Sequence, residues 1–277
     1  MEPVRSILQH ICVLTALVLV STSAFGQTAS TTIGKPTYVE SVELETERKK
    51  DRWSGQIGFG LGLAPRFIGS SRYDVQETLD INLTWNDTVF LEGDRAGIAL
   101  YKSRFLRAGP IARWNLGRAN DLVADINSGE TLDAFELGAF AGTSFYKLFL
   151  SAEAYWGVSG AHRGANVEAE IGYTFELNSG LRVTPIFGAN WGSQKFNQVF
   201  FGVEEDSVLF EPFRAKAGIY ELYAEAAVEQ RLGKNWLIKG TVRLSDLKNS
   251  AADSSITRSE VGERVQFSSF FGVVWLF

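Results

Sequence analysis

The chain of 277 residues carries a net charge of −5, with 27 Gly and 20 Phe against only 6 Pro and one Cys. Its basic residues are not clustered on any predicted strand or loop, which excludes a nucleic-acid-binding role. The single Cys12 lies in the leading apolar segment, so the remaining chain has no disulfide framework and no cysteine metal site.

The first segment is typical of a secretory signal peptide. Arg5 precedes an apolar run at residues 11–20, and small residues follow up to Gln27. We therefore expect residues 1–26 to be removed before Gln27. Residues 27–52 are polar and mixed in charge, which predicts a flexible periplasmic tail. A docking peptide for a periplasmic partner is the alternative to simple disorder.

From residue 53 onward, apolar and polar residues alternate in units separated by turns, and no stretch reaches the ~18 consecutive apolar residues of a membrane helix. A period of two predicts an all-β chain, but alternation alone does not distinguish a soluble barrel, with its apolar set inward, from a membrane barrel. The positions of the tryptophans, described below, favour a transmembrane antiparallel up-and-down β-barrel over residues 53–277. Clear strands are expected at residues 53–64, 75–85, 106–116, 135–145, 148–156, 167–175, 181–191, 220–228, 236–244 and 267–277.

The polar face of these strands carries charges of both signs, which a membrane barrel directs into its lumen. Such a mixture favours internal ion pairs and a plugged or weakly selective interior. The predicted lumen-facing charges are Asp80, Arg107, Arg113, Glu136, Glu153, Glu168, Glu170, Arg182, Glu221, Glu225, Glu229, Lys239 and Arg243, together with Glu92 and Arg231.

All seven tryptophans fall on the apolar face near predicted strand ends. Two rings of Trp at opposite ends of an apolar band predict a girdle at the two membrane interfaces. One ring is formed by Trp53, Trp85, Trp236 and Trp275, and the other by Trp114, Trp156 and Trp191.

The last strand ends the chain on an aromatic residue, Phe277. It resembles the closing strand of a bacterial outer-membrane barrel, and this resemblance implies that Phe277 is the signal that the barrel assembly machinery reads. An ordinary core strand is the alternative interpretation of this segment taken alone.

Loop lengths alternate along the chain, as expected of short periplasmic turns and long outer loops. Because the C-terminus falls on the short-turn side, the number of strands must be even. A turn at Gly93-Asp94-Arg95 splits residues 88–101 into two strands and predicts twelve strands, with ten as the alternative. The short turns are residues 86–87, 146–147, 177–180 and 233–235, and the long loops are residues 65–73, 117–131, 157–165, 192–217 and 245–264.

The hairpin around residues 233–235 has a predictable register. One register places Glu229 opposite Lys239 and also Glu225 opposite Arg243. Opposite charges across a strand pair contribute roughly 0.2–1 kcal/mol each, so they act mainly to fix the register.

Two prolines lie inside predicted strands, at Pro110 and Pro185. A closed barrel needs pairing on both sides of each strand, and proline lacks the N–H that one side requires. We therefore expect bulges or kinks at both positions.

Residues suited to catalysis are sparse. His162 is the only histidine beyond the signal peptide, and an acyl hydrolase would have to recruit Ser159 and Glu153 beside it. Glu153 is expected to face the lumen, away from such a site. The acidic residues in the 201–213 segment lack the spacing and the glycine of a calcium loop. We expect no enzyme activity, no catalytic residue, no cofactor and no metal.

The order of these features resembles the MipA/OmpV family, the MltA-interacting outer-membrane proteins, from Trp53 to Phe277. The departures from the family pattern are Phe200, Ala119-Asn120 and Ser254-Ser255. The matching positions are Trp53, the series Gly58, Gly60 and Gly62, Pro65, Gly69-Ser70, Gly93-Asp94-Arg95, Gly97, Gly109-Pro110, Gly117-Arg118, Phe201-Gly202-Val203, Ser207, Gly218 and Phe277.

The resemblance implies a location in the bacterial outer membrane, in contact with its lipid, and a role as a scaffold. A lytic transglycosylase and a peptidoglycan synthase are the implied partners. The residues themselves leave a second function open, a narrow porin-like channel for small solutes, with residues 192–217 folding inward as a constriction.

Overall fold

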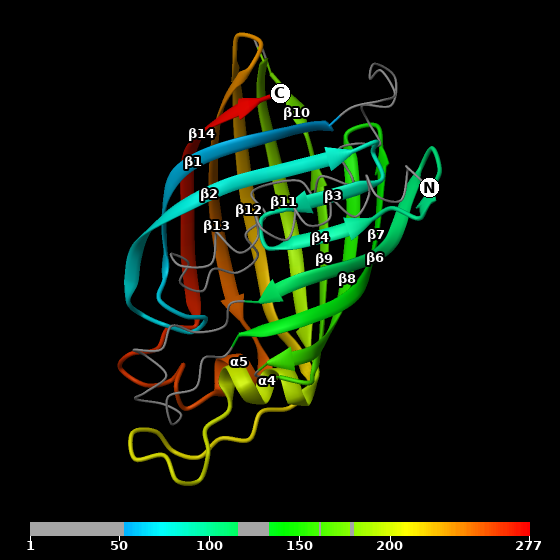
Figure 1. Ribbon diagram of the computed structural model, residues 1–277. Coiled ribbons are helices and arrows are strands. Elements are labelled where there is room, and N and C mark those ends of the chain that lie inside the picture. Colours follow the sequence, from blue (N-terminus) through cyan, green and yellow to red (C-terminus); the bar gives the residue numbers. More distant parts are fainter. Residues whose placement is uncertain (1–52, 116–132, 161, 178–179) are drawn as a thin grey trace.

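The computed structural model describes residues 53–115, 133–160, 162–177 and 180–277. They form one antiparallel sheet of tilted strands that closes on itself as a barrel (Figure 1). The predicted signal peptide, the predicted tail and the whole 117–131 loop lie outside the described residues. No helix in the described ranges is long and apolar enough to cross a membrane.

The strands alternate in direction around the wall, and each pairs with its neighbours in the sheet. Their bounds are β1 (Trp53–Pro65), β2 (Tyr73–Trp85), β3 (Val89–Glu92), β4 (Arg95–Ile98), β5 (Tyr101–Lys102), β6 (Leu106–Asn115), β7 (Ala134–Phe145), β8 (Leu148–Gly160), β9 (Ala165–Tyr173), β10 (Phe175–Glu176), β11 (Leu181–Gly192), β12 (Gly218–Leu232), β13 (Trp236–Leu247) and β14 (Val265–Leu276).

The barrel wall has twelve strand positions. The short β5 continues β4 along β6, and β10 continues β9 along β11. Closure comes from β1, which pairs with β14 from Gln56↔Leu276 to Leu63↔Ser269. The predicted turn at Gly93 is present, with β3 paired to β4 across it. The twelve-strand prediction is therefore confirmed, and the ten-strand alternative is wrong.

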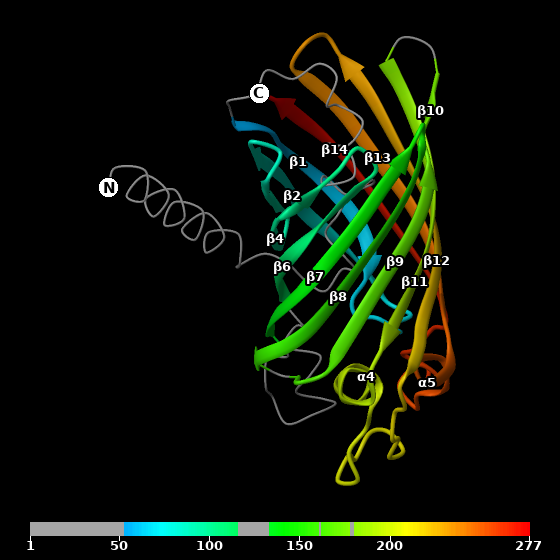
Figure 2. The same ribbon diagram turned by 90° about the vertical axis from the view of Figure 1, so that its right-hand side faces the viewer.

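The two ends of the barrel differ. One end carries the tight turns and the C-terminus, and we call it the short-turn end. Positive φ values at Asn86 (56°), Asp87 (50°) and Tyr146 (55°) show how tightly these turns reverse the chain. The opposite, long-loop end carries the helices α4 (Gln194–Phe201) and α5 (Asn249–Asp253) (Figures 1 and 2).

The prolines interrupt the pairing on one side of their strands. Opposite Pro110, the register on β6 shifts by one residue between β4 and β5, so the predicted bulge is present. Pro185 lies opposite the break between β9 and β10, where the register is kept and only the ladder is interrupted. Of the two expected distortions, a bulge is thus absent at Pro185. The missing N–H accounts for both interruptions.

The register of the β12–β13 hairpin is confirmed, with Glu229 opposite Lys239 and Glu225 opposite Arg243. The Lys239 ammonium group lies 3.7 Å from the Glu229 carboxylate. The guanidinium group of Arg243 reaches along the strand to Glu221, at 3.2 Å. A long side chain thus selects a partner that Cα pairing alone does not predict.

Candidate functional site

The seven tryptophans are partly exposed on the outer face, between 37% and 55%. Trp53 pairs with Trp85 across β1 and β2, and Trp236 pairs with Trp275 across β13 and β14, so one ring is a row of neighbours at the short-turn end. At the other end, β8 continues to Gly160, beyond the predicted strand limit. Trp156 therefore lies inside its strand and not at its end.

The C-terminal residue is held in the wall. The Phe277 backbone exchanges two hydrogen bonds with Gly55, at 3.1 and 3.2 Å. Its ring stacks on Trp275 with a centroid distance of 5.0 Å. The last residue thus completes the β1–β14 seam at the short-turn end.

The predicted charges lie on the inner face of the wall. The fully buried ones are Asp80, Arg107, Arg113, Glu136, Glu153, Glu221, Lys239 and Arg243, and the half-buried ones are Glu168, Glu170, Arg182, Glu225 and Glu229. Glu92 is also buried, whereas Arg231, on the inward side of β12 opposite the buried Leu237, is exposed at the short-turn rim. Ions buried this deeply are tolerated only when they are paired.

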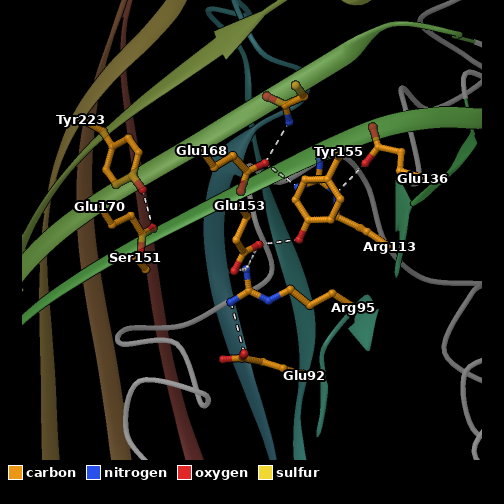
Figure 3. Close-up of polar contacts among 11 residues, drawn as sticks. Glu92, Arg95, Arg113, Glu136, Ser151, Glu153, Tyr155, Glu168, Glu170 and Tyr223 are labelled. Atoms are coloured by element: carbon orange, nitrogen blue, oxygen red, sulfur yellow. Dashed lines mark hydrogen bonds and ion pairs between the residues drawn. The ribbon is translucent and has the colours of Figure 1, made fainter. Parts of the chain in front are cut away.

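Arg95 organises the first ion cluster in the lumen (Figure 3). Its guanidinium group donates to both oxygens of Glu153, at 2.8 and 2.7 Å, and to Glu92 at 3.2 Å. The Tyr155 hydroxyl donates to the same Glu153 carboxylate. Arg95 is not among the predicted lumen charges, because the sequence pattern places it in the turn that begins at Gly93.

Arg113 organises the second cluster. Its Nε donates to Glu136 at 2.6 Å, its Nη1 donates to Glu168, and its guanidinium carbon lies 3.9 Å from the Tyr155 ring centroid. Tyr155 therefore touches both arginine clusters and joins them. Planar guanidinium groups suit such sites because they combine bidentate bonding with stacking.

Two further clusters complete the inner network. Arg243 bonds to Glu221 and lies 3.4 Å from the Tyr223 ring centroid. The Tyr223 hydroxyl donates to Glu170 (Figure 3). Nearer the short-turn end, Lys239 lies 3.2 Å from Asp80. Side chains from most of the wall thus cross the interior and bond to one another.

The long-loop end is covered by a cap with an apolar core of its own. It comprises buried residues from three loops and from the adjoining strand ends, which are Phe67, Phe196, Phe200, Phe201, Val203, Ala215, Tyr220, Leu247, Ala251 and Ile256. Ser193 begins α4, because its hydroxyl accepts from the backbone N–H of Phe196 and also from that of Ala165 on β9. The predicted inward constriction is instead a packed cover over the mouth.

His162 connects this cap to the inner network. Its ring is buried, lies edge-on to Phe196 at 5.1 Å, and places Nε2 2.9 Å from Oε1 of Glu136. The contact lacks the alignment of a hydrogen bond. His162 contacts neither of its predicted hydrolase partners through a described bond; Glu153 is bound to Arg95 and Tyr155 instead.

One cavity lies outside the lumen. It is an apolar groove of about 570 Å³ on the outer wall, lined by Ala141, Ala152, Ala169 and Ala189 with larger residues beside them. A second cavity of about 40 Å³ lies inside, between Arg243 and the loop after β1. Within the described ranges, no group of three or more His, Cys, Asp or Glu side chains is arranged to hold a metal ion.

Solved barrel structures show only remote similarity to this chain. The barrel domain of Pseudomonas aeruginosa OprF is 15% identical, with 52% of this chain and 88% of that chain covered and a TM-score of 0.25. Neisserial surface protein A is 12% identical, with 81% and 97% covered and a TM-score of 0.26. OmpT of Vibrio cholerae is 9% identical, with 83% and 99% covered and a TM-score of 0.30.

Among curated protein sequences, none matches this chain. The family model described as MltA-interacting protein MipA matches residues 57–277, which spans the barrel from β1 to the C-terminal Phe277. Gly58, Gly60 and Gly62 of β1, the Gly93 turn and the cap segment all fall within this match. The chain belongs to the MipA family of MltA-interacting proteins.

Proposed function

We propose that this protein is an outer-membrane scaffold that presents fixed surfaces to peptidoglycan-remodelling enzymes and does not conduct solutes. The observation that carries the proposal is the filled interior. Four ion clusters cross the lumen, and the cap packs its own apolar core over one mouth. An open pore would require these buried ions to separate, which is energetically costly.

The family description supports a lytic transglycosylase of the MltA type as one partner. A peptidoglycan synthase is the second proposed partner. We assign residues 1–26 as a removed signal peptide and residues 27–52 as the docking segment. On this view the seven tryptophans mark the two membrane interfaces, and the short-turn end faces the periplasm with the docking segment.

Planar bilayer recording tests the sealed lumen. We expect no steady conductance from the purified barrel. Residues 204–211 project from the cap, and a variant that lacks them should also show no steady conductance. A steady conductance that grows when residues 192–217 are shortened would support the porin-like channel instead.

Co-purification with an MltA-type transglycosylase tests the scaffold. We expect the full-length protein to retain the enzyme on an affinity column and a variant lacking residues 28–50 to lose it. The matched control is the variant lacking residues 204–211, which removes exposed residues at the opposite end and should retain the enzyme. Equal retention by both variants would contradict the docking role of the tail.

A further inference from the structure

Among the strands that the structure describes, one section of the barrel wall has a backbone edge with no paired neighbour. β3 pairs with β2 only from Asn82 to Trp85, and the last contact is the bond from Gly93 N–H to the Ile81 carbonyl. The rest of β2, from Tyr73 to Asp80, pairs with β1 alone. Figure 1 shows the short β3 and β4 following only the arrowhead half of β2.

The free groups belong to alternate residues. Because the Ile81 carbonyl points toward β3, the backbone groups of Leu79, Glu77 and Val75 point to the same side. The even-numbered residues between them bond to β1 instead. None of these three residues has a described hydrogen bond on its open side. Unpaired N–H and C=O groups are strongly unfavourable in a bilayer, which is why membrane barrels close.

The same place carries a charge on the outer face. Glu77 points outward and is exposed, between Val75, which is 71% exposed, and Leu79. Its neighbour on β1 is Leu61, and the next residue in the row is Phe271 on β14, both exposed and apolar. An acidic side chain within an apolar outer band is costly where lipid covers it.

The open backbone edge of β2 and the outward carboxylate of Glu77 are each unfavourable in contact with lipid, for independent reasons. Both occur at the same place on the wall. We propose that β2 from Tyr73 to Asp80 is a docking edge for an extended strand of another polypeptide, with a basic residue opposite Glu77 and apolar residues opposite Val75 and Leu79. An added strand would pair every free backbone group, as in other cases of β-strand addition. At about 3.3 Å per residue, the edge accepts roughly eight residues.

A second copy of this chain fits the edge less well. The outward residues of β2 near the edge are Tyr73, Val75, Glu77, Leu79 and Ile81, which include no basic side chain. Pairing two such edges would place two carboxylates in the interface without a cation. Charge complementarity therefore favours a partner of different sequence.

Peptide binding tests the proposal on the full-length protein in detergent micelles. The probes are two synthetic seven-residue peptides, Thr-Val-Thr-Lys-Thr-Val-Thr and the same peptide with a central Glu. We expect saturable binding of the Lys peptide and binding on the order of tenfold weaker for the Glu peptide, because opposite charges across a strand pair attract and like charges repel. Equal binding of both peptides, or none, would overturn the proposal.

Two variants at Glu77 distinguish the contribution of backbone pairing to peptide binding from the contribution of the Glu77 charge. Glu77→Gln keeps the edge and should remove the preference for the Lys peptide. Glu77→Pro removes an N–H on the open side without breaking a bond to β1, so it should abolish binding of both peptides while the heat-dependent gel shift of a folded barrel persists. If Glu77→Pro fails to fold, the exchange measurement below decides alone.

Amide hydrogen exchange locates the bound peptide. We expect the Lys peptide to slow exchange at Val75, Glu77 and Leu79 by at least tenfold, and to leave Gln76 and Thr78, already bonded to β1, unchanged. Slowing by lipopolysaccharide-containing vesicles but not by the peptide would show that lipid covers the edge, and the proposal would fail.

Discussion

Replacement of Arg113 by methionine tests the view that paired ions hold the lumen closed. The substitution removes the cation that bonds to Glu136 at 2.6 Å and to Glu168, and it removes the contact with the Tyr155 ring. Two carboxylates then remain buried without their cation. Breaking a buried pair from one side costs about 3–5 kcal/mol, so we expect the free energy of unfolding to fall by about 4 kcal/mol.

Urea unfolding of the barrel in lipid vesicles, followed by tryptophan fluorescence, measures this loss. A matched control is Arg258→Met, which breaks an exposed ion pair with Asp253 and should cost at most about 1 kcal/mol. A triple variant that adds Glu136→Gln and Glu168→Gln to Arg113→Met should recover most of the loss, because neutral replacements remove the unpaired charge. If Arg113→Met were no more destabilising than Arg258→Met, the ion network would not hold the lumen closed.

Three further predictions follow from contacts at the ends of the barrel. Deletion of Phe277 should lower the amount of protein in the outer-membrane fraction, measured by immunoblotting, whereas replacing it with tyrosine should not; normal levels of the deletion variant would refute an assembly role. Gly157→Ala should cost about 1–3 kcal/mol in urea unfolding, because its Cβ would lie 2.2 Å from the His162 carbonyl oxygen, while Gly218→Ala, whose nearest neighbour is at 3.7 Å, should be neutral. Phe200→Ala should cost about 3–5 kcal/mol and expose the cap to protease, and an unchanged digestion pattern would show that the cap core contributes little.

The topology of the barrel could be predicted because it follows from local rules. Alternation of side chains fixes which residues face inward, and loop lengths fix the parity of the strand count. Together they required a turn at Gly93, where glycine adopts a φ of 55°. The partners of the inner charges could not be predicted in the same way. Arg95 and Glu153 are 58 residues apart, and only the closed, tilted wall brings them together.

The cap was missed for a different reason. Residues 192–217 show no alternation of apolar and polar residues, so the strand pattern predicts only a loop there. A helical signal was nevertheless present, because Ser193 precedes Phe196 and Phe200, which lie four residues apart on one face of α4. A hydroxyl residue followed by apolar residues at helical spacing is the pattern that would have identified the cover over the lumen.

The residues that break a pattern are more informative than those that keep it. The predicted inward charges of the barrel obey the period of two, and most of the buried ones form ion pairs within the lumen. Glu77 alone among the acidic residues of β2 lies on the outer face, and it stands beside backbone groups to which none of the described strands bonds. On the proposed function, the outer wall and the two ends are the surfaces through which this barrel acts. In the half of β2 from Tyr73 to Asp80, the open backbone groups and the Glu77 carboxylate make contact with lipid especially unfavourable.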